Sequence, residues 1–177
     1  MTVRVLVTSD THVSIGARLP TALLELADRA DHVIHAGDHI TLDAYDTIAA
    51  LAPVTAVHGN VDDAMTCLKL PDRAEVELGG VRLGIVHVPG PESGRRERLA
   101  GWFPECDVII YGHTHMPELR HIGEVDGRLR LLINPGSPTQ RRRASTHTVC
   151  WLELRAGEIL VADLIHLDDP EPASSGT

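Results

Sequence analysis

VRVLVTSDTH, residues 3–12, is the stretch that decides the fold of this chain. Its first five residues predict a buried β-strand, because β-branched and aliphatic side chains suit a pleated sheet. The strand runs directly into Asp10 and His12, which lie on the same side of an extended segment because successive side chains alternate. A carboxylate and an imidazole at a strand end are typical of a metal centre at the edge of an α/β sheet.

Four further apolar runs end in side chains of the same kind. They are HVIHAG before Asp38, PVTAVHG before Asn60, VRLGIV before His87, and DVIIYG before His113 and His115. In three of these runs the last residue is glycine, whose freedom lets the chain turn sharply and approach an ion closely. We therefore expect these side chains and the DxH pair to meet at one edge of a sheet.

The spacing of apolar residues predicts alternating strands and helices in the first half of the chain. Strands are expected at residues 3–7, 32–36 and 54–57, and helices at 21–30 and 42–51. Strands separated by helices indicate right-handed βαβ units and a parallel sheet.

The second half of the chain is richer in strands. A hairpin is expected from 75–78 to 81–86 around Gly79-Gly80, followed by a short helix at 95–101. Further strands are expected at 107–111, 118–122, 129–133, 147–154 and 158–165. The predicted fold class is α/β, as a four-layer αββα sandwich of two mixed β-sheets. We expect one domain over residues 1–167 and a disordered tail over 168–177, which is rich in Pro, Ser and acidic residues.

Composition limits the class of protein. A length of 177 residues with 43% hydrophobic side chains is enough for one sizeable core. The formal net charge of −9 disfavours sequence-independent binding to nucleic acid or to anionic membranes. Cys67, Cys106 and Cys150 form no CxxC pair, which favours a reducing, cytoplasmic compartment. No apolar run approaches the roughly 20 residues of a membrane span, and Arg4 interrupts the apolar start that a signal peptide needs.

The predicted ligands suit a pair of divalent ions. Aspartate, asparagine and histidine together bind manganese, which we favour, with iron, zinc, nickel, cobalt or magnesium as alternatives. Seven ligands exceed what one ion takes from a protein, and the two oxygens of Asp38 allow that carboxylate to be shared. Two-metal sites hold their ions about 3.5–4 Å apart and clamp the attacking and leaving oxygens of a phosphoryl displacement. The pattern therefore predicts hydrolysis of a phosphoester by a hydroxide bound between the two metals.

Each motif alone is weak evidence, because Gly-Asp and Gly-Asn are common turn dipeptides. Together the order DxH, GD, GN, H and GHxH resembles the calcineurin-like metallophosphoesterase superfamily. The short chain and the turn at Asn134–Ser137 resemble its small single-domain phosphodiesterase branch, the YfcE-like proteins, from Val3 to Ile165. The resemblance implies one ion bound by Asp10, His12, Asp38 and His115. It implies a second ion bound by Asp38, Asn60, His87 and His113. It also implies that Asn60 contacts the substrate phosphate, so Asn60 and Asp38 are the predicted catalytic residues.

Two positions depart from the superfamily pattern. Many members carry a histidine directly after the asparagine, where it acts on the leaving group, whereas this chain has Val61. Relatives often have HGH at the next motif, whereas this chain has His87-Val88-Pro89-Gly90, so no role for a second histidine carries over. The missing proton donor favours a phosphodiesterase over an enzyme for phosphomonoesters with poor leaving groups.

Three other functions stay open as alternatives. A phosphomonoesterase or nucleotide phosphatase would use the same ligands. An interaction scaffold is the second, because the retromer subunit of this fold has lost histidine ligands, but this chain keeps all seven. A nuclease is disfavoured by the net charge of −9 and the lack of an added DNA-binding domain. The expected partner is therefore a small phosphoester, with no membrane or nucleic acid. Relatives form dimers or tetramers, so a homo-oligomer also stays open.

Histidines outside the motifs have alternative interpretations. His39 follows Asp38 directly and either points away from the site or contacts the substrate. His35 and His58 lie within or at the end of strands, where a core or supporting role fits better than metal ligation.

Two basic runs also have alternative interpretations. Arg141, Arg142 and Arg143 form either a solvated loop or a clamp on phosphate, since guanidinium pairs well with phosphate. The run Arg95–Arg98 either caps the cleft or forms an exposed helix face. The turn at Asn134–Ser137 is expected near the site.

Overall fold

The computed structural model describes residues 1–14, 18–125 and 128–168, and the elements along these residues follow. The strands are β1 (Val3–Thr8), β2 (His32–Ala36), β3 (Val54–Val57), β4 (Arg73–Leu78), β5 (Val81–Val86), β6 (Val108–Tyr111), β7 (Glu118–Val125), β8 (Arg128–Asn134), β9 (Thr148–Arg155) and β10 (Glu158–His166). The helices are α1 (Thr21–Arg29), α2 (Leu42–Ala49), α3 (Ala64–Lys69) and α4 (Arg95–Trp102).

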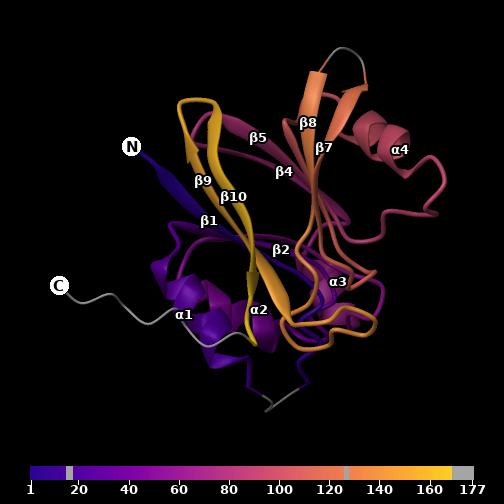
Figure 1. Cartoon of the computed structure of the whole chain (residues 1–177). Coiled ribbons are helices and arrows are strands. Elements are labelled where there is room, and N and C mark those ends of the chain that lie inside the picture. The colour runs from indigo at the N-terminus through magenta and orange to yellow at the C-terminus, as the bar shows by residue number, and fades with distance from the viewer. Residues whose placement is uncertain (15–17, 126–127, 169–177) are drawn as a thin grey trace.

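The strands form two mixed five-stranded sheets (Figure 1). The first has the order β10-β9-β1-β2-β3, in which β1, β2 and β3 pair in parallel and β9 and β10 pair antiparallel. The second has the order β4-β5-β6-β8-β7, with parallel β5, β6 and β8 at its centre and an antiparallel strand at each edge. The predicted parallel pairing of the first half and the predicted hairpin at Gly79-Gly80 are both confirmed.

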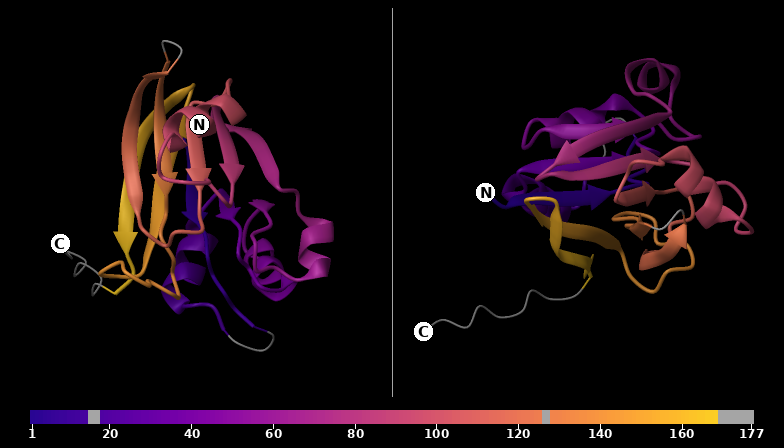
Figure 2. Two further views of the ribbon diagram at one scale, coloured as in Figure 1. Left: turned by 90° about the vertical axis from the view of Figure 1, so that its right-hand side faces the viewer. Right: turned by 90° about the horizontal axis from the view of Figure 1, so that it is seen from above.

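Apolar side chains hold these elements in four layers. Val7 and Ile85 belong to a buried cluster that lies between the two sheets. Leu6, which points the opposite way from Val7 because side chains alternate along a strand, packs with α1 and α2 on the outer face of the first sheet. Leu99 of α4 packs with residues on the outer face of the second sheet. Figures 1 and 2 show α1 and α2 outside the first sheet and α4 outside the second, which is the predicted αββα sandwich.

The predicted elements are confirmed with small shifts at their ends, and α3 is an additional helix. The sequence of α3 has no apolar stripe to predict it, and its Met65 and Leu68 are exposed. Its start is encoded by Asp63, whose side chain accepts a hydrogen bond from the Thr66 backbone N–H at 2.8 Å. Residues 169–177 of the predicted disordered tail lie outside the described residues.

The fold brings the ends of five strands to one place. Parallel pairing puts the carboxyl ends of β1, β2 and β3 at one edge of the first sheet, and those of β5 and β6 at one edge of the second. The two edges meet, because His87 after β5 donates from Nδ1 to the carbonyl of Ala36 at the end of β2, at 2.7 Å. Across the described parts of the chain, every helix is too short or too polar to cross a membrane.

Candidate metal centre

Asp10, His12 and His115 bring three ligand atoms together after β1 and β6. The Nε2 atom of His115 lies 3.1 Å from Asp10 Oδ1 and 3.1 Å from His12 Nε2. His12 Nε2 lies 3.8 Å from the same Asp10 oxygen. Asp10 and His115 are fully buried, so this group is protected from solvent on that side.

Asp38, His87 and His113 form a second group after β2, β5 and β6. The Nε2 atom of His87 lies 3.1 Å from Asp38 Oδ1. Asn60, which follows β3, joins the group through its Oδ1 atom, 3.1 Å from His87 Nε2 and 2.8 Å from His113 Nδ1. The structure therefore brings all seven predicted ligands together in two adjoining groups.

The Asp38 carboxylate lies between these two groups. Its Oδ1 atom faces His87 in the second group at 3.1 Å, and its Oδ2 atom lies 3.6 Å from His12 Nε2 in the first. Each carboxylate oxygen has its own lone pairs, so one side chain in this position can serve two cations.

The protonation of the histidines fits a site for cations. His87 donates from Nδ1 to the Ala36 carbonyl at 2.7 Å, and His115 donates from Nδ1 to the Gln140 carbonyl. A neutral imidazole with its proton on Nδ1 presents a lone pair on Nε2, which is the form that binds metals. These lone pairs face carboxylate oxygens, and such an arrangement is repulsive unless a cation or a proton lies between the two atoms.

The same pairs of atoms act as hydrogen bonds when a proton, instead of a cation, lies between Nε2 and the carboxylate oxygen. Burial raises the pKa of Asp10, but hydrogen bonds with His115 and His12 outweigh burial and hold that pKa well below its usual range. Burial also raises the pKa of Asp38, but the hydrogen bond with His87 outweighs burial, so the Asp38 pKa is lowered overall. Burial lowers the pKa of His87, but the Asp38 and Asp10 carboxylates raise it overall. The site thus holds two ionised carboxylates that attract positive charge.

Five of the seven predicted ligands adopt a left-handed backbone conformation. Their φ angles are 55° for Asp10, 44° for His12, 59° for Asp38, 72° for His113 and 58° for His115. Such conformations cost a residue with a side chain about 1–3 kcal/mol each and cluster at functional sites. Tertiary contacts, and not local propensity, therefore hold these side chains in the cluster.

Two glycines allow the strand ends to approach one another. A Cβ atom at Gly112 would lie 2.0 Å from Ser9 Oγ, and one at Gly59 would lie 2.0 Å from Asp38 Oδ1. Real Cβ atoms essentially never approach another atom within 3.0 Å. A side chain at either position would therefore displace the groups around the candidate ligands.

Three hydroxyl groups support the site. Ser9 Oγ donates to Asp10 Oδ2 at 2.7 Å. Ser137 Oγ donates to the Asp10 carbonyl at 2.7 Å, and Thr139 Oγ1 lies 3.2 Å from the same oxygen. The expected position of the Asn134–Ser137 turn near the site is confirmed. Sequence patterns do not mark Ser9 or Thr139, because a hydroxyl that binds a nearby backbone carbonyl or carboxylate leaves no characteristic spacing.

The other histidines near the site lie in the protein interior. His39 is fully buried and stacks on His35, with ring centroids 3.7 Å apart, so the structure favours the interpretation in which His39 points away from the substrate. His35 is also fully buried, and its Nε2 atom lies 3.1 Å from Thr11 Oγ1. His58 is half-buried and donates from Nδ1 to a neighbouring backbone carbonyl. Both have the core or supporting role expected of them.

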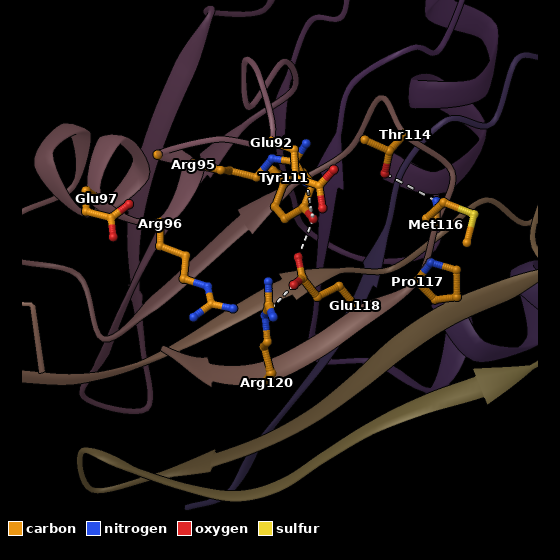
Figure 3. A pocket seen from close by; sticks show the side chains of 11 residues that line it. Glu92, Arg95, Arg96, Glu97, Tyr111, Thr114, Met116, Pro117, Glu118 and Arg120 are labelled. Atoms are coloured by element: carbon orange, nitrogen blue, oxygen red, sulfur yellow. Dashed lines mark hydrogen bonds and ion pairs between the residues drawn. The ribbon is translucent and has the colours of Figure 1, made fainter. Parts of the chain in front are cut away.

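A pocket of about 660 Å³ adjoins the loop that carries His113 and His115, because Thr114 and Met116 line it (Figure 3). Its charged lining residues are Arg95, Arg96, Arg120, Glu92, Glu97 and Glu118. Figure 3 shows Glu118 bonded to both Tyr111 and Arg120. Equal numbers of arginines and glutamates give no net attraction for a phosphate. None of the seven predicted ligands lines this pocket, so the metal cluster is the candidate site for chemistry.

Residues 3–157 match the calcineurin-like phosphoesterase superfamily domain. The chain belongs to this superfamily. A probable metallophosphoesterase from Methanocaldococcus jannaschii is 37% identical over 140 residues, which are 77% of this chain and 68% of the relative. The structure of a novel archaeal phosphodiesterase is 26% identical with a TM-score of 0.68, over 92% of this chain and 99% of that chain. The structure of Vacuolar Protein Sorting 29 from Cryptosporidium parvum is 24% identical with a TM-score of 0.76, over 95% of this chain and 93% of that chain.

These similarities confirm the family resemblance and the fold class that the sequence predicts. The matched domain is a phosphoesterase domain and the named relative is a probable metallophosphoesterase, so this chain is assigned to the phosphoester hydrolases. Two groups of metal-ligand side chains agree with that assignment. The similarity to the vacuolar sorting protein extends to the fold alone.

Proposed function

We propose that this superfamily member is a phosphodiesterase that works with two divalent metal ions. The observation that carries the proposal is the Asp38 carboxylate, with Oδ1 3.1 Å from His87 Nε2 and Oδ2 3.6 Å from His12 Nε2. A carboxylate that faces two ligand groups in this way serves two cations at once. The similarity to an archaeal phosphodiesterase supports the choice of substrate class.

The donor set fits two divalent ions because carboxylate, amide and imidazole groups meet in one cluster. Within each group the ligand atoms of the aspartate and histidines lie within 4.8 Å of one another. When bound, the two ions activate water and neutralise charge on the phosphoryl oxygens, and manganese is the metal we favour. We assign one ion to Asp10, His12, Asp38 and His115, and the other to Asp38, Asn60, His87 and His113.

The protein holds these ligands in place through hydrogen bonds. The His113 backbone N–H donates to Asp10 Oδ2 at 3.0 Å, which ties the ends of β6 and β1 together. The Val61 backbone N–H donates to Asp38 Oδ1 at 3.2 Å. The hydrogen bond from His87 Nδ1 to a backbone carbonyl prevents that ring from turning. The ligands are therefore preorganised, which reduces the reorganisation needed during reaction.

Asn60 has a second role in the proposal. It is the exposed member of the cluster, and its Oδ1 atom lies near His87 and His113. Among the described residues, its amide nitrogen has no hydrogen-bond partner. We assign these N–H groups to an oxygen of the substrate phosphate.

The residue after Asn60 bears on the substrate class. Val61 is 43% exposed and has no proton to give to a leaving group. General-acid assistance is typically worth about 10²–10⁴-fold in rate, so esters with good leaving groups are favoured. A diester also carries one negative charge where a monoester carries two, which suits a site that contains the Asp10 and Asp38 carboxylates. Both arguments favour diesters.

Steady-state kinetics with Mn²⁺ test the proposal. We expect kcat/KM for bis(p-nitrophenyl) phosphate to exceed that for alkyl phosphomonoesters by about 100-fold or more, since the general acid is missing. The monoester p-nitrophenyl phosphate has the same leaving group and separates the effect of charge from that of the leaving group. Equal or faster hydrolysis of the monoesters would establish the phosphatase alternative. A metal-loaded protein that hydrolyses none of these esters would favour the interaction scaffold.

A further inference from the structure

The segment after β8 is tied to the candidate metal centre by side-chain hydrogen bonds. Ser137 Oγ donates to the Asp10 carbonyl at 2.7 Å, and Thr139 Oγ1 donates to the Thr11 carbonyl at 2.7 Å. His115 donates from Nδ1 to the Gln140 carbonyl. These bonds fix the path of the backbone beside the predicted ligands, so a side chain that follows them has a defined position relative to the cluster.

Arg142, which comes two residues later, holds its guanidinium against the loop after β6. Its Nη1 atom donates to the His113 carbonyl at 3.2 Å. Arg142 has a φ of 47°, a left-handed conformation that a residue with a side chain adopts where its surroundings require it. The side chain is exposed, and no carboxylate in the described part of the chain pairs with it. Most of its N–H donors are therefore available to a ligand.

The open side of the metal cluster is the side on which Arg142 lies. Four of the predicted ligands are at most 2% exposed. Asn60, by contrast, is exposed and His113 is half-buried. A substrate therefore reaches the cluster past these two residues, and Arg142 is hydrogen-bonded to one of them.

A phosphate at this position needs positive charge from the protein. The cluster contains the carboxyl groups of Asp10 and Asp38, and the chain carries a formal net charge of −9. The Arg142 guanidinium lies beside the cluster, because its Nη1 atom is 3.2 Å from the carbonyl oxygen of His113, one of the predicted ligands. The guanidinium is thus close enough to offset part of the repulsion between these carboxylates and an anion.

We propose that Arg142 binds a non-bridging oxygen of the substrate phosphate at the open side of the metal cluster. The inference rests on the proposed phosphoesterase function and adds a substrate-binding residue to it. A guanidinium suits this task because its planar fork of N–H groups matches the geometry of phosphate oxygens. One guanidinium also matches the single negative charge of a phosphodiester, which is the substrate class proposed above.

The neighbouring Arg141 provides a matched control. It is also exposed, but its Nη1 atom donates to the Ser145 carbonyl at 2.7 Å, within the same loop. A general electrostatic effect of the basic run would be the same for both arginines. A direct contact with the phosphate would depend on Arg142 alone.

The experiment compares Arg142→Ala, Arg142→Lys and Arg141→Ala in the metal-loaded protein. The binding probe is inorganic phosphate, with Kd measured by isothermal titration calorimetry, and the kinetic probe is kcat/KM for bis(p-nitrophenyl) phosphate. Arg142→Ala should weaken phosphate binding and lower kcat/KM by about 10–100-fold, the effect expected of one hydrogen bond to a charged group. Arg142→Lys should recover part of this loss, and Arg141→Ala should change either value by less than about twofold. Guanidinium chloride at low concentration should partly rescue Arg142→Ala and leave Arg141→Ala unchanged.

Metal content and Tm separate this role from a structural one. If Arg142 only held the His113 loop, Arg142→Ala would lose metal or thermal stability together with activity, and that result would overturn the proposal. Unchanged phosphate affinity in Arg142→Ala, or equal losses in Arg142→Ala and Arg141→Ala, would also overturn it. Failure of the proposed function would give a different result from failure of the Arg142 proposal. The wild-type protein would then hydrolyse no ester, but Arg142→Ala would still bind inorganic phosphate more weakly than the wild type.

Discussion

Replacement of Asp38 by asparagine tests the shared carboxylate on which the two-metal proposal depends. The change keeps the size of the side chain and an oxygen that can accept the Val61 N–H. It replaces the second oxygen with an NH₂ group, which binds no cation. Because the carboxylate lies 3.1 Å from His87 and 3.6 Å from His12, the loss reaches both ligand groups. We expect the Asp38→Asn variant to lose both ions.

The size of the effect follows from the linkage between binding and stability. An ion present at 100 times its Kd stabilises the folded state by about 2.7 kcal/mol. Each kcal/mol shifts the Tm of a chain of about 150–250 residues by about 2–4 °C, so one bound ion should raise Tm by about 5–11 °C. Loss of a residue that merely supports a metal ligand costs about 10–100-fold in metal affinity. At the upper end of that range, the same ion concentration stabilises Asp38→Asn by only about 0.4 kcal/mol per site.

The assay combines metal content after dialysis against Mn²⁺ with Tm measured by scanning calorimetry, with and without EDTA. His115→Ala and His87→Ala are the matched controls, because each removes a side chain from one group only. Each control should keep one ion per chain and part of the metal-dependent rise in Tm. Two ions and a wild-type rise in Tm for Asp38→Asn would refute the shared carboxylate. A complete loss of metal from both histidine variants would refute the division into two sites.

Three further perturbations test other parts of the structure. Val61→His should raise kcat/KM for alkyl phosphomonoesters by at most about 10²–10⁴-fold, and no gain would show that position 61 does not reach the leaving group. Gly112→Ala should lower the free energy of unfolding by about 1–3 kcal/mol, because its Cβ would lie 2.0 Å from Ser9 Oγ. In the same urea titration Gly101→Ala, whose Cβ meets nothing within 4 Å in α4, should be neutral or stabilise the protein by up to about 1 kcal/mol. Burial lowers the folded-state pKa of His35 below its unfolded value of about 6.5, so on acidification the unfolded chain takes up the proton first. Below about pH 6.5 the free energy of unfolding of the metal-free protein should therefore fall by up to about 1.4 kcal/mol per pH unit because of this histidine. If the His35→Gln variant had the same pH dependence, His35 would not be its source.

Much of the fold could be predicted from the sequence, because a buried strand has a local run of apolar side chains that can be recognised. The run VRVLV before Asp10 and the run DVIIY before Gly112 are apolar because β1 and β6 lie inside the protein. The identity of the seven candidate ligands was also local information, since each follows such a run directly. The helix α3 could not be found in this way, because it buries little apolar surface and is marked mainly by its Asp63 cap.

Distances between residues far apart in the chain depend on how the two sheets pack, and no local pattern contains them. His12 and His115 are 103 positions apart, and only the packing of β1 against β6 places their Nε2 atoms 3.1 Å from one another. Likewise, the sequence does not distinguish Arg141 from Arg142, because both are arginines in the same basic run. The backbone at Arg142 adopts a left-handed conformation, and its guanidinium binds the backbone carbonyl of His113 in the loop after β6, whereas the guanidinium of Arg141 binds a carbonyl of its own loop. The sequence by itself determined which chemical groups are available, and tertiary structure decided which of them act together, because local periodicity encodes burial whereas contact is set by the packing of distant segments.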